Sequence, residues 1–91
     1  MIRQVDWLHY SELYDVLRAH GFSSVPLENS GILFRHPSGA LLPFGALSPD
    51  EQVATYHYGA IRAAMDDYAI MTRDAFDLAL LQAAHRLPTA A

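Results

Sequence analysis

The chain contains no cysteine, and no apolar run in it approaches the length needed to cross a membrane. Without cysteine there is no disulfide, no thiolate zinc site and no cysteine nucleophile, and a reducing compartment is favoured. The N-terminal residues MIRQVDWLHY lack the sustained apolar core of a signal peptide. The sequence therefore predicts a cytoplasmic protein that does not interact with membranes.

Positive charge is also scarce. The chain has 6 basic residues, all of them arginine, against 10 acidic residues, for a formal net charge of −4. Proteins that bind nucleic acid gain much of their affinity from Lys and Arg placed against phosphates, and they usually carry a basic surplus. An RNA contact would therefore depend on local clustering of a few arginines, and a protein partner is favoured over RNA.

The composition is otherwise that of a globular protein, because 52% of the residues are apolar and 18% are charged. A chain of 91 residues is expected to form one domain, here 1–91, with a modest core. We predict that the core spans about 11–86 and that 87–91 form a frayed tail. Residues 1–10 are mixed in character and predict no regular element.

The first half of the chain predicts a helix followed by three strands. Ser11 suits a helix N-cap, and Gly21 stands where a glycine would end that helix, at about 11–20. Alternating and β-branched residues with turn signals between them then predict strands at 22–27, 31–36 and 40–44. Pro26 and Pro43 cannot donate to a sheet ladder, so both outer strands are expected to be edges. This order predicts an α+β fold with a three-stranded antiparallel sheet.

The second half predicts two helices. Ser48-Pro49-Asp50-Glu51 has the form of a capping box with proline at the first helical position, which predicts a helix at about 49–67. A further helix is predicted at about 73–86, with Thr72 or Met71 near its start. The sheet is expected to pack against the helices.

Little in the sequence indicates catalysis. The five histidines, at 9, 20, 36, 57 and 85, show no metal-ligand spacing, and no nucleophile or phosphate-binding motif occurs. Asp66 and Asp67 point about 100° apart on a helix and are expected to be solvated. We therefore predict no metal, no cofactor and no catalytic residue. Arg35 is a candidate phosphate contact, although a solvent-facing strand residue is the simpler interpretation.

The order of several short motifs resembles the HicA toxin family. The matching stretches cover about residues 11–80, and they are His20-Gly21-Phe22, NSGILFRHPSG at 29–39, GAIRAAM at 59–65, and Ile70 with Phe76. HicA proteins are small mRNA interferases with a double-stranded-RNA-binding-like α-β-β-β-α fold, and they pair with HicB antitoxins. The resemblance implies that fold here, with an added helix, and an antitoxin-like partner.

Three departures from the family weaken the implied activity. Gly31 takes the place of the family's catalytic histidine, the basic character is lost, and the segment 46–58 is longer than usual. His36 does not replace that histidine, because strand alternation puts it on the other face and five strand residues span roughly 16 Å. His57 could approach only through tertiary packing. Without an imidazole, acid–base cleavage of RNA loses its proton carrier.

Three functional hypotheses follow. The first is a HicA-like domain without ribonuclease activity, acting as a binding or regulatory module with protein contact favoured. The second is an RNA-binding or residual mRNA interferase module, whose candidate residues are Ser30, Arg35, Arg62 and His57. The third is a homo-oligomeric module that associates through an exposed strand edge and the aromatic residues Trp7, Tyr10, Tyr14 and Tyr58.

Overall fold

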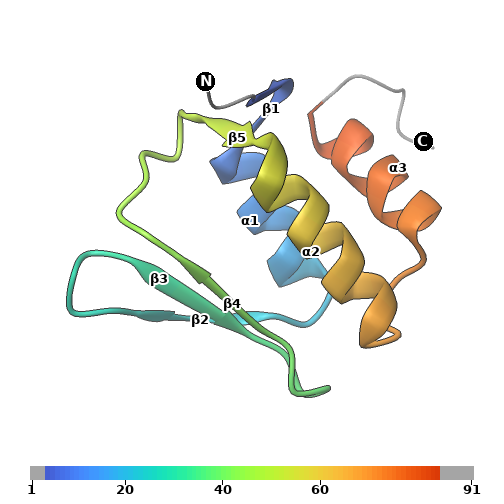
Figure 1. The fold of residues 1–91 in the computed structure, drawn as a ribbon, viewed down its shortest axis with the longest axis horizontal. Coiled ribbons are helices and arrows are strands. Elements are labelled where there is room, and N and C mark those ends of the chain that lie inside the picture. The colour runs from blue at the N-terminus through green and yellow to red at the C-terminus, as the bar shows by residue number, and fades with distance from the viewer. Residues whose placement is uncertain (1–3, 85–91) are drawn as a thin grey trace.

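A computed structural model describes residues 4–84 of the chain (Figure 1). The strands are β1 (Gln4–His9), β2 (Ser23–Pro26), β3 (Ile32–Arg35), β4 (Leu41–Phe44) and β5 (Gln52–Ala54). The helices are α1 (Tyr10–Ala19), α2 (Thr55–Asp67) and α3 (Arg73–Ala83). None of the described helices is both long and apolar enough to span a bilayer.

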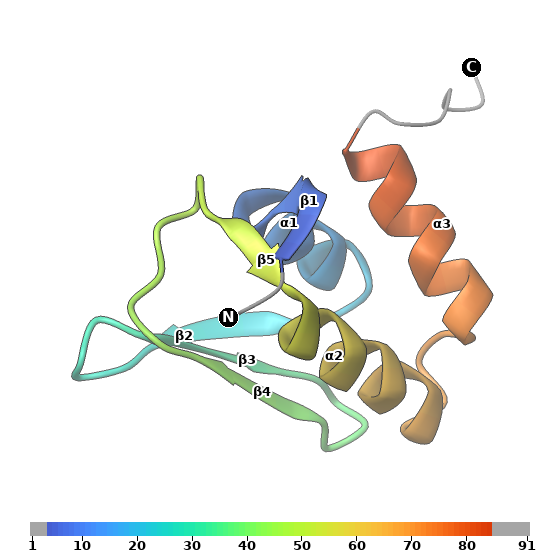
Figure 2. The ribbon, with the colours of Figure 1, turned by 45° about the horizontal axis from the view of Figure 1, so that its top comes forward.

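The larger sheet has the order β2-β3-β4 and is antiparallel throughout. Helices α1 and α2 lie over one face of it, and α3 packs against both of those helices (Figure 2). Phe34, Leu42 and Phe44 project from the covered face into the core, where Leu13 and Leu17 of α1 meet them. The structure thus confirms the predicted α+β fold and its three-stranded antiparallel sheet.

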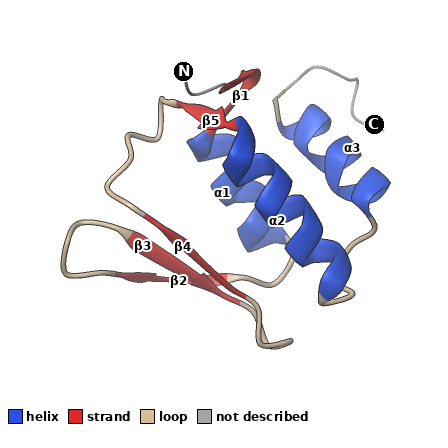
Figure 3. Ribbon diagram, in the orientation of Figure 1, coloured by secondary structure: helices blue, strands red, loops and turns tan. Residues whose placement is uncertain are grey.

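A second, two-stranded sheet was not predicted. β1 and β5 pair antiparallel beside the N-terminus of α1 (Figure 3). Leu8 of β1 and Val53 of β5 are fully buried, so the core begins before residue 11. The first helix starts at Tyr10 and not at Ser11, because the Glu12 carboxylate accepts a hydrogen bond from the backbone N–H of His9 at 2.8 Å.

The prediction that the second helix begins at about 49 was wrong, because α2 begins at Thr55. The capping contacts do form: the Ser48 N–H donates to Glu51 Oε2 at 3.1 Å, and the Asp50 N–H bonds Ser48 Oγ at 3.4 Å. They close only a turn. The carbonyls of Pro49 and Glu51 instead accept the first backbone N–H groups around α1, each at 3.0 Å, and the chain continues into β5.

The C-terminal helix agrees with its prediction over its described length. α3 begins after Thr72, whose side chain accepts a hydrogen bond from the N–H of Ala75 at 3.1 Å as an N-cap does. It runs to Ala83. The predicted end at 86, the tail 87–91 and His85 lie outside the described residues.

Candidate functional site

The uncovered face of the larger sheet presents two rows of side chains. Residues that pair across antiparallel strands share a face, and successive residues alternate between faces. The first row is Ser23, Arg35 and Leu41, and the second is Val25, Leu33 and Pro43. We call these six residues the outer face.

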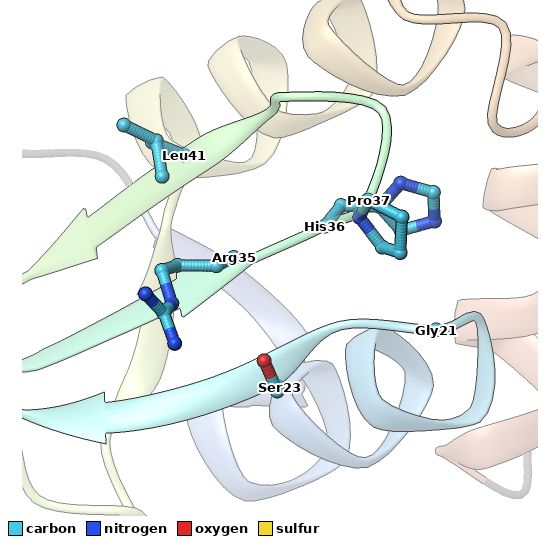
Figure 4. A pocket seen from close by; sticks show the side chains of 6 residues that line it. All are labelled: Gly21, Ser23, Arg35, His36, Pro37 and Leu41. Carbon is cyan, nitrogen blue, oxygen red and sulfur yellow. The ribbon is translucent and has the colours of Figure 1, made fainter.

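The outer face is largely apolar and open to solvent. Leu41 is 59% exposed, Val25 and Leu33 are partly exposed, and no described element lies over them (Figure 2). At one end of the face is a shallow depression of about 340 Å³. Figure 4 shows its lining, which is Gly21, Ser23, Arg35, His36, Pro37 and Leu41.

Arg35 differs from the other arginines of the described part of the chain. Three of them pair with carboxylates, as Arg18 with Asp15 at 3.8 Å, Arg62 with Asp77 at 3.0 Å and Arg73 with Asp66 at 3.1 Å. Among residues 4–84 no carboxylate pairs with Arg35, which projects from the middle strand beside Ser23 and Leu41. The outer face therefore carries one uncompensated positive charge in an apolar surround.

His36 has a structural role at the end of this face. Its Nδ1 accepts a hydrogen bond from the Ser38 N–H at 3.0 Å, so the proton of the neutral ring lies on Nε2, which donates to the His20 carbonyl at 3.2 Å. The ring also packs on Phe22, with centroids 4.9 Å apart. Nδ1 thus holds the β3–β4 turn, and Nε2 joins that turn to the end of α1.

The two edges of the sheet are each blunted by a proline. The N–H of His36, directly after β3, bonds the Ala40 carbonyl on the β4 side, and the N–H of Leu27, directly after β2, bonds the Gly31 carbonyl on the β3 side. Alternation along the ladders then places Pro26 and Pro43 at positions whose backbone nitrogens point away from the sheet. Each edge lacks one outward donor, so pairing with an added strand is disfavoured, as the prediction of edge strands implied.

The position aligned with the family's histidine has no space for a side chain. A Cβ on Gly31 would lie 2.5 Å from the Phe44 carbonyl oxygen and 3.0 Å from Asn29 Oδ1. The Asn29 side chain accepts the Gly31 N–H at 3.2 Å, which fixes this turn. Ser30 beside it has φ 67°, a left-handed conformation that is costly for serine. Glycine is therefore required at 31 by close backbone approach.

His57 lies on the helix side of the sheet, in the first turn of α2. Its ring packs on Phe44, with centroids 5.4 Å apart, and its Nδ1 is 2.7 Å from the Tyr10 hydroxyl. That hydroxyl also accepts the Ala54 N–H at 3.2 Å, and it can donate its own proton to an unprotonated Nδ1. Burial lowers the pKa of His57, and burial also raises the pKa of Tyr10 despite the bond from Ala54.

The second ring nitrogen of His57 is not buried. Within residues 4–84 its Nε2 forms no hydrogen bond, and no buried polar side-chain atom there lacks a partner. In the tautomer whose Nδ1 accepts the Tyr10 proton, Nε2 carries the ring proton and is a donor. Local sequence does not indicate this pair, because residues 10 and 57 are brought together by the pairing of β1 with β5, the strands that lead into α1 and α2.

Arg62 is held within the helical layer. Its guanidinium forms three hydrogen bonds of 3.0–3.2 Å to the Asp77 carboxylate of α3, and the Tyr58 hydroxyl donates to the same carboxylate. The hydrogen bond to Asp77 raises the pKa of the Arg62 guanidinium above its ordinary value. Burial, followed by the bond to Asp77, raises the pKa of Tyr58 to about 12. This cluster joins α2 to α3.

The four candidate RNA contacts do not form one site. Ser30 lies in the turn before β3, whereas Arg35 ends that strand. His57 packs under the covered face of the sheet, and Arg62 is bound to α3. Sequence reasoning missed the depression around Arg35, which strand alternation and the prolines could have indicated.

Neither a metal site nor a comparison with known proteins indicates the function. No group of three metal-ligating side chains comes together within residues 4–84. Comparison with known protein families, curated proteins and solved structures gave no match. The geometry of the outer face is therefore the main guide to function.

Proposed function

We propose that this chain is a HicA-like domain without ribonuclease activity that binds protein through its outer face. The observation that carries the proposal is the exposed apolar surface of Val25, Leu33 and Leu41 around the unpaired cation of Arg35. Protein interfaces combine a desolvated apolar centre with a few polar anchors, and arginine is enriched among them. A purely solvated sheet face would instead carry polar side chains at these positions.

The absence of cleavage is supported by the surroundings of the histidines. Gly31 cannot be replaced by histidine without moving the backbone at Phe44. His36 uses both ring nitrogens in the fold, and His57 lies on the opposite side of the sheet from Arg35. A phosphate held by Arg35 would therefore meet no imidazole nitrogen free for proton transfer, because the neighbouring His36 has both of its nitrogens bonded.

The preference for protein over RNA is supported by the charges. Binding to RNA requires several free cations along one surface, because each phosphate contact adds to affinity. Three of the described arginines are already paired with aspartates, and the chain has a net charge of −4. The alternative RNA-binding role would require Asp77 to release Arg62.

Purified protein at low salt provides the test. Single-stranded and double-stranded RNA should remain intact on gels, and fluorescence anisotropy should show no binding that weakens with added salt. Cleavage that disappears in His57→Ala would overturn the proposal. So would salt-sensitive RNA binding that disappears in Arg35→Ala but persists in Arg73→Ala, the matched control.

A further inference from the structure

We infer that the partner of the outer face is a second copy of this chain, packed sheet against sheet about a two-fold axis at Leu33. This inference rests on the proposed protein-binding function and names its partner. A two-fold contact joins the same patch on both copies, so the patch must be self-complementary. The outer face and the turn that precedes β3 together meet that requirement in charge.

Opposite charges stand beyond the two ends of the apolar row, along the direction of β3. Arg35 ends β3, and Glu28 lies exposed in the turn that precedes β3. The apolar residues Val25, Leu33 and Pro43 form the row between these ends. The two-fold axis lies between the two sheets, parallel to them, and crosses the strands at Leu33. Rotation by 180° about this axis reverses the strand direction, so Arg35 of each copy is carried toward Glu28 of the other.

The spacing suits this arrangement. Arg35 is two residues from Leu33, roughly 7 Å along the strand, so the two arginines of a dimer stand roughly 14 Å apart. That separation exceeds the Debye length of about 8 Å at physiological salt, so their mutual repulsion is weak. Packed sheets lie about 10 Å apart, a gap that the Leu33 and Leu41 side chains of both copies would fill.

The edges of the sheet make the face the better contact. Pro26 and Pro43 each remove an outward donor from an edge strand, so a dimer through a continuous sheet would lack backbone hydrogen bonds there. Of the aromatic residues considered for an interface, Tyr10 and Tyr14 are buried and Tyr58 is bonded to Asp77, while Trp7 packs partly against the core. Of the exposed large apolar side chains, Leu41 belongs to the outer face, and Tyr56, Tyr68 and Leu78 lie on or directly after helices α2 and α3.

Charge exchange tests the inference. Sedimentation equilibrium over a range of protein concentrations should show a reversible dimer for the natural chain. Arg35→Glu and Glu28→Arg should each weaken dimerisation by roughly tenfold or more, because each places like charges opposite one another. The double variant R35E/E28R should recover the dimer. Asp74→Arg on α3, away from the face, should not affect it.

The outcomes separate this inference from the proposed function. A natural chain that stays monomeric at high concentration, or a double variant that dimerises no better than the single variants, overturns the inference. The broader proposal would still stand if a different protein were cross-linked specifically from position 33. Circular dichroism of each variant confirms that it is folded, and all the substituted residues are exposed.

Discussion

Gly31 illustrates how one residue constrains both the fold and the activity. Its α-carbon faces the carbonyl of Phe44 so closely that a methyl group would lie 2.5 Å from the oxygen. The resemblance drawn from the sequence implied only that glycine stands where a histidine would be expected. The structure supplies a physical reason for glycine at this position, which is the close approach of the last residue of β4.

We expect Gly31→Ala to lower the free energy of unfolding by about 1–3 kcal/mol, because backbone must shift to relieve the contact. Gly59→Ala is the matched control. Nothing lies within 4 Å of a Cβ at Gly59, which is inside α2, so alanine there should stabilise the protein by about 0.5–1 kcal/mol. Urea denaturation measures both. A neutral Gly31→Ala would show that the turn can yield and that a histidine could fit.

His57 should make stability depend on pH. Burial lowers the pKa of His57 in the folded protein from its ordinary value of 6.5, so below that pH the unfolded chain binds the proton more readily. Unfolding is therefore favoured progressively as the pH falls from 7 through 6.5 toward the lower folded pKa. Protonation also places a donor on Nδ1 against the Tyr10 hydroxyl, which already accepts the Ala54 N–H.

The measurement is the urea midpoint at several pH values between 7 and 5.5. The natural protein should lose stability on acidification more steeply than His57→Gln, which retains an acceptor for Tyr10 but does not titrate. Equal slopes for the two proteins would remove His57 as the cause.

At the scale of elements, α3 is joined to α2 by the polar cluster at Asp77 and by the ion pair of Arg73 with Asp66. Tyr58 and Arg62 of α2 both bond the Asp77 carboxylate of α3. We expect Tyr58→Phe to cost about 1 kcal/mol and to speed amide exchange in α3, because Asp77 loses one of its donors. Tyr56→Phe is the control, since Tyr56 is 62% exposed and should leave exchange unchanged. Equal exchange in α3 for both variants would contradict the role of the cluster.

The elements also show what local sequence could and could not predict. The three strands of the larger sheet and the cap of α3 by Thr72 follow from residues close in sequence. The capping box at Ser48 forms its predicted local hydrogen bonds, but it does not begin a helix. Backbone carbonyls of this turn instead accept hydrogen bonds from the first turn of α1. This contact joins residues about 40 positions apart, so local sequence patterns cannot predict it.

For the whole molecule, the fold class could be predicted more fully than the site. Alternation along 31–44 and the two prolines define the sheet, its edges and the residues of its two faces. Which face the helices cover, and the pairing of β1 with β5, depend on contacts between distant residues. The exposure of Leu41 and the unpaired state of Arg35 are likewise results of packing.

The central claim is that the outer face contacts protein and not RNA. The most direct measurement places a photoreactive phenylalanine analogue at Leu33, with the exposed Ala75 of α3 as the control position, in the organism that encodes the chain. Irradiation should yield a protein adduct from position 33 that survives ribonuclease and is absent from position 75. An adduct removed by ribonuclease, or no adduct from position 33 beyond the control, would contradict the claim.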